Sequence, residues 1–167
     1  MPQSPETGRT RTYAWGDAKS AAAAARGMSG IEYLGALMKG TLAPPPIMAT
    51  LGFRLAELGD GRAVFECEPR EFHYNALGTV HGGLAATLID SATGCAVHTQ
   101  LPAGTGYTTV NLGVDNIKAI SDTVGTLRCI GRVVRAGNRI AVADAELVGP
   151  DGTLYARGSA TCLVLRG

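Results

Sequence analysis

Residues 82–100 read GGLAATLIDSATGCAVHTQ, and they form the most regular pattern in the chain. The apolar side chains recur at the spacing of a single helix face, which is typical of an amphipathic α-helix packed against a core. The residues on this face are Leu84, Ala85, Leu88, Ile89, Ala92, Cys95 and Ala96. The sequence therefore predicts one long helix at the centre of the fold.

Strand-like runs lie on both sides of this helix. Two short runs precede it, at 50–58 and 62–69, and a Gly-Asp-Gly turn sequence at 59–61 joins them. Four runs joined largely by turn residues follow it, at 107–117, 123–135, 140–148 and 154–165. This order predicts an α+β fold in which an antiparallel β-sheet wraps around one long central helix.

The first 45 residues have a different composition. Residues 1–18 mix Pro, Gly, Ser, Thr and Arg without a period, so we expect a disordered or loosely docked arm. Apolar residues at helical spacing predict one extra N-terminal helix over 21–42, and the triple proline at 44–46 is expected to end it as a stiff connector. We therefore divide the chain into an N-terminal arm and helix at 1–45 and a main domain at 46–167.

Composition limits the classes of partner. A chain of 167 residues suits one domain, and its net charge of +1 gives no reason to expect a nucleic acid or an anionic membrane as partner. The four cysteines are widely spaced and lie among apolar neighbours, which indicates buried thiols in a reducing compartment rather than a metal site. No stretch approaches the ~18 apolar residues of a membrane span. We therefore expect a cytoplasmic protein without a metal.

The segment that leads into the long helix, HYNALGTVHGG at 73–83, holds the groups best suited to chemistry. Gly82 and Gly83 follow His81 at the predicted helix start, where backbone N–H groups have no partner within the helix. Such an end can bind a polarised carbonyl oxygen and stabilise the oxyanion formed from a thioester. A tight packing turn is the simpler explanation of the glycines alone.

Asp90 lies two turns further along the helix, among small residues and opposite the bulky face. Small neighbours let a ligand approach a carboxylate, although a solvated acid on an exposed face explains the spacing more simply. Gly82 and Asp90 lie about 12 Å apart along the helix axis, whereas an oxyanion donor and a base must both come within about 3 Å of one carbonyl group. If both act, two chains with antiparallel helices must share the site.

The pattern Asn75-x-x-Gly78-x-x-His81-Gly82-Gly83, followed by Asp90, resembles the signature of hotdog-fold acyl-CoA thioesterases. The similarity is closest to the phenylacetate-degradation (PaaI-like) type and to the related mammalian acyl-CoA thioesterases. TTVNL at 108–112 resembles the strand that follows the helix in this family, and RAGNR at 135–139 resembles its late hairpin. The resemblance runs from about 51 to 165, so residues 46–167 are identified as a hotdog thioesterase domain.

The resemblance implies a hydrolase that cleaves an acyl-CoA to the free acid and coenzyme A, as a homodimer or homotetramer with shared sites. Coenzyme A is part of the substrate, and no cofactor is implied. Asn75 would hold the attacking water or the thioester, and the Gly82 N–H would polarise the carbonyl group. Asp90 of the partner subunit would act as general base or nucleophile. His81 would form part of the wall of the thioester pocket.

The resemblance also implies a hydroxyl on the strand after the helix, which positions the water. An alignment without a gap places this hydroxyl at Thr109, while Thr108 is one position away and faces the other side of the strand. Strict alternation would put Thr109 on the same face as Asn111 and Asp115. Because these neighbours on the same face are polar, Thr109 is favoured over Thr108.

Binding of coenzyme A is expected at Gly83 and at the late hairpin. Arg135 and Arg139 flank Gly137 and Asn138 in that hairpin, and guanidinium groups suit the phosphates of coenzyme A. Solvation of a hairpin explains the two arginines as well. The sequence does not indicate the acyl group.

Two other functions stay open. A hotdog module that binds acyl-CoA without turnover has no need of an acid beside the carbonyl group. A hotdog dehydratase or hydratase needs a catalytic histidine set against an acid. The one histidine within the family pattern, His81, adjoins the glycine N–H groups and lies far from Asp90 on the same helix.

Overall fold

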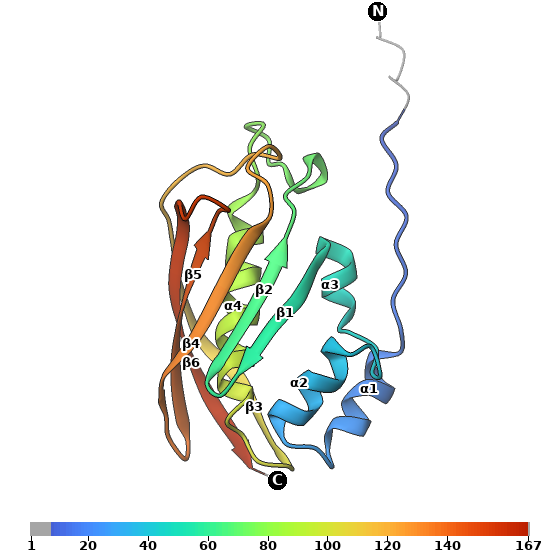
Figure 1. The fold of residues 1–167 in the computed structure, drawn as a ribbon, viewed down its shortest axis with the longest axis vertical. Coiled ribbons are helices and arrows are strands. Elements are labelled where there is room, and N and C mark those ends of the chain that lie inside the picture. The colour runs from blue at the N-terminus through green and yellow to red at the C-terminus, as the bar shows by residue number, and fades with distance from the viewer. Residues whose placement is uncertain (1–7, 167) are drawn as a thin grey trace, which may run out of the picture.

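The structure is a computed structural model and describes residues 8–166 (Figure 1). Three short helices precede the sheet: α1 (Ala18–Ala25), α2 (Gly30–Met38) and α3 (Pro46–Leu51). The body consists of β1 (Phe53–Gly59), β2 (Arg62–Cys67), the 3-10 turn η1 (Glu71–His73), α4 (Gly82–His98), β3 (Thr105–Asn116), β4 (Leu127–Ala136), β5 (Ile140–Val148) and β6 (Leu154–Arg166). No helix in this described range is both long and apolar enough to cross a membrane.

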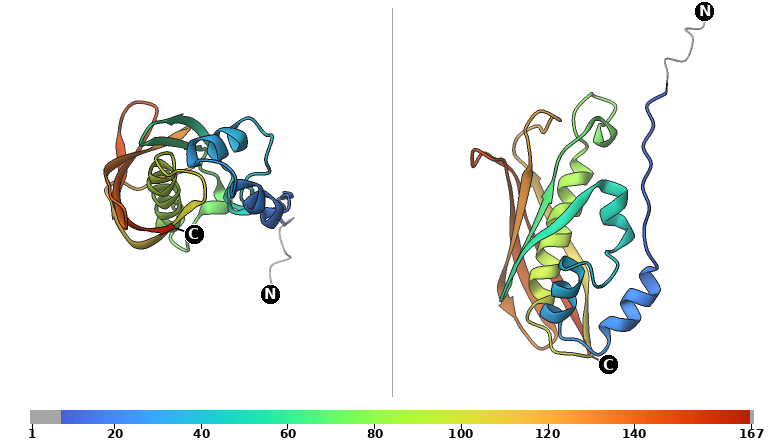
Figure 2. Two further views of the ribbon diagram at one scale, coloured as in Figure 1. Left: turned by 90° about the horizontal axis from the view of Figure 1, so that it is seen from below. Right: turned by 45° about the vertical axis from the view of Figure 1, so that its right-hand side comes forward.

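The six strands form one antiparallel sheet in the order β1-β2-β4-β5-β6-β3. The sheet curves around α4, as Figure 2 shows in the view along the helix. This is the hotdog arrangement, and it confirms the fold class expected from the sequence. β3 lies at one end of the strand order, so one of its edges has no strand partner among residues 8–166.

The core lies between α4 and the concave face of the sheet. Leu88, Ile89, Ala92 and Ala96 of α4 are all 0% exposed, and each large apolar side chain buried in this way stabilises the fold by about 1.5–3 kcal/mol. Asp90 follows Ile89 directly and is only half-buried. It therefore points out of the core, beside β3, rather than into bulk solvent on a fully exposed face.

The N-terminal helical segment is confirmed, but its prediction as a single helix over 21–42 is wrong, because the segment is divided into α1 and α2. The break coincides with a capping box that the apolar spacing did not reveal. The Ser29 backbone N–H donates to Glu32 Oε2 at 2.8 Å, and such a box starts a new helix. The N–H of Gly30 also donates to the Leu101 carbonyl at 2.9 Å, so α2 begins against the far end of α4.

The triple proline is not only a connector. Pro46 occupies the first turn of α3, a position where the missing N–H costs nothing and the fixed φ angle suits a helix. Thr50, which was expected in a strand, is therefore helical. β1 begins only at Phe53, after Gly52 ends α3 with a φ of 68°.

Residues 8–17 form an extended, exposed segment that contacts the body at a few points, and residues 1–7 lie outside the described range. The Arg11 guanidinium donates to the Ala49 carbonyl at 2.8 Å and lies 4.0 Å from the centre of the Phe72 ring. Of the two expectations for the arm, the described part corresponds to the loosely docked one.

Candidate active site

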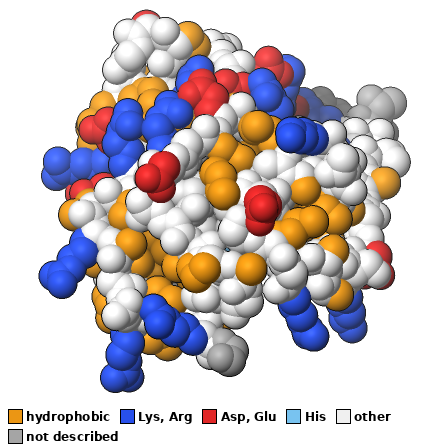
Figure 3. All heavy atoms as spheres, turned by 60° about the horizontal axis from the view of Figure 1, so that its bottom comes forward, with side chains coloured by type: hydrophobic (Ala, Val, Ile, Leu, Met, Phe, Trp, Pro, Cys, Tyr) orange, Lys and Arg blue, Asp and Glu red, His pale blue; other side chains and the backbone are white. Residues whose placement is uncertain are grey.

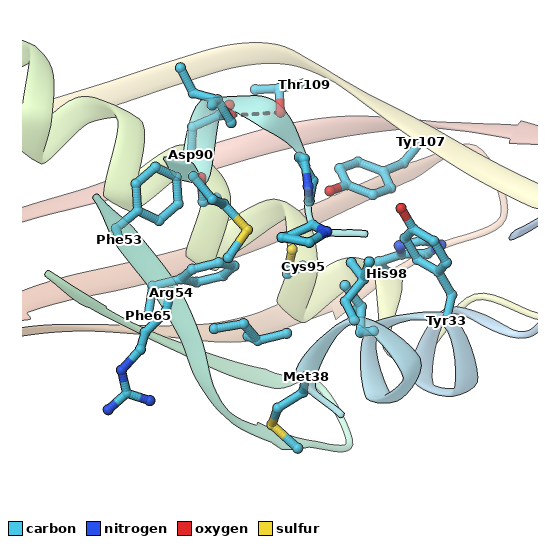
Figure 4. Close-up of a pocket in the computed structure, with 18 residues that line it drawn as sticks. Tyr33, Met38, Phe53, Arg54, Phe65, Asp90, Cys95, His98, Tyr107 and Thr109 are labelled. Carbon is cyan, nitrogen blue, oxygen red and sulfur yellow. Dashed lines mark hydrogen bonds between the residues drawn. The ribbon is translucent and has the colours of Figure 1, made fainter. Parts of the chain in front are cut away.

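Asp90 and Thr109 lie together on facing elements. The Thr109 hydroxyl of β3 donates to Asp90 Oδ1 of α4 at 2.8 Å, the contact drawn as a dashed line in Figure 4. A hydroxyl donor orients a carboxylate and leaves its second oxygen free to accept another proton or hydrogen bond. The sequence expected these two residues in one site, and a single chain brings them together.

The reason given for choosing Thr109 is wrong, although the residue does contact Asp90. Thr109 pairs with Cys162 and Asn111 pairs with Thr161, so Val110 forms a β-bulge between them. A bulge reverses the alternation of faces and re-aims the side chains around it. Thr109 therefore shares the inner side of β3 with half-buried apolar residues, whereas Asn111 and Thr108 are exposed.

A pocket of about 620 Å³ opens beside Asp90 and Thr109. Its apolar wall is formed by α2, α3, β1 and β2, with Leu34, Met48, Phe53 and Phe65 among the residues that contribute. Apolar walls with few polar groups are typical of a site for a small organic ligand. The N-terminal helices, which lie outside the resemblance, thus supply much of the pocket.

Four titratable groups also line this pocket: Tyr33, Cys95, His98 and Tyr107. Burial raises the pKa of both tyrosine hydroxyls and lowers the pKa of the His98 imidazole. Burial also raises the pKa of the Cys95 thiol to about 12. All four groups are therefore neutral at neutral pH. The sequence had assigned a functional role to none of them.

A spacing signal could have found part of this group. Tyr107 stands two residues before Thr109 on one strand, where residues i and i+2 face the same side. His98 follows Asp90 by eight positions, so it lies about 80° around the helix from Asp90, on an adjoining face. Tyr33 comes from a separate helix, and no local spacing relates it to Asp90.

The start of α4 is capped by its own histidine. His81 Nδ1 accepts from the Gly83 N–H at 2.8 Å, and the His81 carbonyl accepts from Leu84 N–H at 2.9 Å. The Gly82 N–H has no acceptor among the described residues. Of the two glycines proposed for the site, only Gly82 keeps a free backbone donor.

Asn75 holds its own loop. Its Oδ1 accepts from the backbone N–H groups of Leu77 at 2.8 Å and Thr79 at 3.3 Å, and its Nδ2 donates to Thr79 Oγ1 at 3.1 Å. One Nδ2 hydrogen stays available for another acceptor. Neither Asn75 nor the His81-Gly82-Gly83 segment lines the pocket beside Asp90.

The hairpin residues Arg135, Gly137, Asn138 and Arg139 lie at the turn between β4 and β5. In Figure 1 this turn and the 75–83 loop are at opposite ends of the molecule. Asn138 Oδ1 accepts from the Arg166 guanidinium at 2.9 Å, while both proposed arginines are exposed. None of these four residues lines the Asp90 pocket.

Comparison with known proteins agrees with the resemblance to thioesterases found in the sequence. The model of the thioesterase superfamily matches residues 77–156. A protein of Halobacterium salinarum, named as a candidate esterase, is 32% identical over 110 residues, which is 64% of this chain and 72% of that protein.

Solved structures agree in fold. A conserved protein of Pseudomonas aeruginosa is 30% identical with a TM-score of 0.68, over 73% of this chain and 95% of that one. A phenylacetic acid degradation-related protein of Ralstonia eutropha is 26% identical with a TM-score of 0.71, over 78% and 98%. PaaI of E. coli, from the phenylacetic acid degradation operon, shares the fold with a TM-score of 0.71 at 20% identity, over 84% and 97%.

The curved sheet around one long helix, with an acid on that helix, defines a hotdog-fold protein of the thioesterase type. The chain belongs to the thioesterase superfamily and is of the PaaI-like type. Membership of this family supports hydrolysis of a thioester in general.

Proposed function

We propose that the chain hydrolyses an acyl-CoA to the free acid and coenzyme A, with Asp90 as general base or nucleophile. One observation carries the proposal: the Asp90 carboxylate, oriented by Thr109 at 2.8 Å, lines an apolar pocket of about 620 Å³ in a member of the thioesterase superfamily. A carboxylate of this kind suits attack on a carbonyl group, and the apolar walls suit an acyl group.

In the general-base route, Asp90 takes a proton from a water molecule as its oxygen bonds to the thioester carbon. The tetrahedral intermediate places its oxyanion at the Gly82 N–H, and Asn75 Nδ2 holds the water or the thioester. The C–S bond then breaks, and the coenzyme A thiolate takes up the proton. In the nucleophilic route the Asp90 carboxylate itself bonds to the carbon, the C–S bond breaks and coenzyme A leaves as the thiolate. Water then hydrolyses the mixed anhydride to the free acid and the restored Asp90 carboxylate, and the proton released goes to the thiolate.

The free edge of β3 supports a shared site. An unpaired edge strand is a template for pairing with a second chain. Antiparallel pairing of two β3 edges around a two-fold axis also makes the two α4 helices antiparallel, so the Asp90 of each chain can face the Gly82 end of the other. A homodimer is the smallest assembly of this kind, and a homotetramer can contain two such dimers.

The coenzyme A phosphates are assigned to the β4–β5 hairpin, with Arg135 and Arg139 as their partners. In an antiparallel dimer, the hairpin end of one chain and the 75–83 loop of the other lie at the same end of the assembly. Figure 3 turns the hairpin end toward the viewer and shows lysine and arginine side chains projecting around its rim. Exposed guanidinium groups at a rim suit a solvated nucleotide.

Release of free thiol from a panel of acyl-CoAs tests the proposal, with Asp90→Asn as the matched variant. We expect turnover of at least one acyl-CoA by the native chain and a large loss in the variant. Tight binding of acyl-CoA without any thiol release would favour the binding module instead. Release of water from a hydroxyacyl-CoA, with the thioester intact, would favour the dehydratase.

A further inference from the structure

The pocket beside Asp90 has a polar end. Tyr33 of α2, His98 at the end of α4 and Tyr107 of β3 lie close together there, with ring centres 5.6 Å apart for Tyr33 and His98 and 5.4 Å for His98 and Tyr107. Figure 4 shows these three rings gathered at one side of the pocket, while Phe53 and Phe65 lie at the other. Three separate elements therefore bring hydrogen-bonding groups to one place.

These groups have little to bind within the protein. The Tyr33 hydroxyl and the His98 imidazole have no hydrogen-bond partner among the described residues, and the Tyr107 hydroxyl has only the Cys95 thiol, a weak partner. No fully buried side-chain oxygen or nitrogen in the described range lacks a partner, so these atoms are open to the pocket rather than sealed in the core. They are available to a ligand.

Close packing holds the polar end in shape. A Cβ atom on Gly94 would lie 2.7 Å from the Tyr107 hydroxyl oxygen, so only glycine lets this ring lie across α4. A Cβ atom on Gly30 would lie 1.7 Å from the His98 carbonyl oxygen, so the start of α2 is fixed against the end of α4. Tyr33 is three residues further along α2. Its position is therefore determined by packing rather than by a mobile loop.

The polar end is uncharged. Burial keeps both tyrosines protonated, because it raises their pKa, and it keeps His98 neutral, because it lowers the imidazole pKa. Arg54 also lines the pocket, but it pairs with Glu66, and Figure 4 shows its guanidinium directed away from the polar end. A carboxylate in this position would lose its hydration without gaining a cation. A neutral hydroxyl or carbonyl is the better match.

The polar end stands at a defined distance from Asp90. Tyr107 precedes Thr109 by two residues, so it lies about 6–7 Å away along β3. His98 follows Asp90 by eight positions, so it lies about 12 Å away along α4. Apolar side chains of α2, β1 and β2 line the rest of the pocket. A ligand that reaches from Asp90 to the polar end therefore meets polar groups at both of its ends and apolar walls beside it.

We propose that the preferred acyl group has an apolar body and a neutral hydrogen-bonding group, such as a hydroxyl, at its far end, which Tyr33, His98 and Tyr107 bind. The proposal rests on the proposed function, because it places the thioester carbonyl beside Asp90. Tyr33 is then a specificity residue contributed by the N-terminal helices. This gives the segment that precedes the thioesterase domain a role in choosing the substrate.

The test compares unbranched acyl-CoAs of increasing length with their ω-hydroxy counterparts. Because the polar end is at a fixed depth, the ratio of kcat/KM for the hydroxylated and plain substrates should peak at one chain length. At that length it should exceed one by about three- to tenfold, the value of one or two hydrogen bonds. An ω-carboxylate of the same length should show no such gain.

Phenylalanine variants assign the effect to residues. Tyr33→Phe and Tyr107→Phe should each bring the ratio toward one, because they remove a hydroxyl and leave the ring. Tyr13→Phe is the matched control, since Tyr13 is 42% exposed and does not line the pocket. A ratio that is the same at every length, or a peak that both pocket variants retain, would overturn the inference.

Failure of the proposed function gives a different result. If no acyl-CoA is hydrolysed, the reaction is wrong, and the pocket is then tested by binding. Calorimetry with thioether analogues of the same plain and ω-hydroxy compounds gives a ratio of affinities without turnover. The same peak at one chain length, and its loss in Tyr33→Phe and Tyr107→Phe, supports the inference. A flat ratio contradicts it.

Discussion

The two halves of α4 hold their polar groups in different ways. At the start of the helix, Asn75 is bonded to its own loop and His81 caps the Gly83 N–H, so the polar groups largely satisfy one another. In the second half, Asp90 has Thr109 as a side-chain partner, and His98, together with Tyr33 of α2, faces a pocket without any partner among residues 8–166. The polar groups at the start of the helix are thus mostly satisfied within the chain, whereas those of the second half are available to a ligand.

Each half also lacks what the other has. The start of α4 offers a free backbone donor at Gly82 but no acid, and the middle offers an acid but no oxyanion donor. About 12 Å of helix separates the two groups in one chain. Complementary halves on one rigid helix are what a two-fold dimer with antiparallel helices requires. The comparison leads to four predictions.

The largest effect is expected at the acid. Asp90→Asn keeps an oxygen that can accept from Thr109, so the fold and the pocket should persist, but an amide is neither a base nor a nucleophile. We expect kcat to fall by about 10²–10⁴-fold. Free thiol release measures the rate, and an unchanged melting temperature confirms folding. Activity within about threefold of the native chain would remove Asp90 from the mechanism.

Complementation between the halves is the next largest effect. Asn75→Asp keeps a side-chain oxygen for the Leu77 and Thr79 N–H groups but loses the amide donor, so it should be nearly inactive with its loop intact. In a mixed dimer of this variant with Asp90→Asn, one site combines the intact Asn75 and Asp90, and the other site carries both changes. After random exchange about half of the dimers are mixed.

Recovery should therefore approach about a quarter of native activity, since half of the dimers have one good site of two. Each variant mixed with itself under the same conditions is the control. Exchange is verified by mass spectrometry of differently labelled subunits. If exchange is verified but no activity returns, one chain builds the whole site. The proposal that each site combines Asn75 of one chain with Asp90 of the other would then be wrong.

Periodicity was enough to predict the architecture. The apolar face of residues 84–96 predicts α4, and β5 has the predicted bounds, because both depend on local spacing against one core. The spacing of Asp90 did not select it, because a solvated acid on an exposed face explains that spacing more simply; the resemblance to the thioesterase signature did. The distance of about 12 Å between Asp90 and Gly82 along the helix also follows from the geometry of a helix alone.

The features that were not predicted depend on contacts between distant segments. The bulge at Val110 arises in the pairing of β3 with β6, and it decides which threonine faces Asp90. The break before α2 coincides with the docking of Gly30 onto the end of α4. The polar end of the pocket joins α2, α4 and β3, which are far apart in the chain. The spacing of residues within one helix or strand cannot predict a contact between elements that are far apart in the chain.

The third prediction separates the two neighbouring threonines. Thr109→Val removes the hydroxyl that donates to Asp90, and we expect kcat to fall about tenfold or somewhat more, from the lower end of the value of a hydrogen bond to a charged group. Thr108→Val changes an exposed residue on the other face of β3 and should have no effect. Thr109→Ser should restore most of the rate, which a purely structural role of the methyl group would not predict. Equal losses in the two valine variants would contradict the bulged register.

The smallest effect is expected at the hairpin. Arg135→Ala with Arg139→Ala should raise KM for an acyl-CoA by about tenfold and leave kcat nearly unchanged, because phosphate contacts far from the carbonyl bind substrate and transition state alike. The native KM should also rise with salt, and the double variant should show a weaker salt dependence, since exposed charges are screened. Arg132→Ala is the control, an exposed arginine on the same strand outside the turn. If KM and its salt dependence do not change, the hairpin arginines only solvate the turn, and the phosphates bind elsewhere in the dimer.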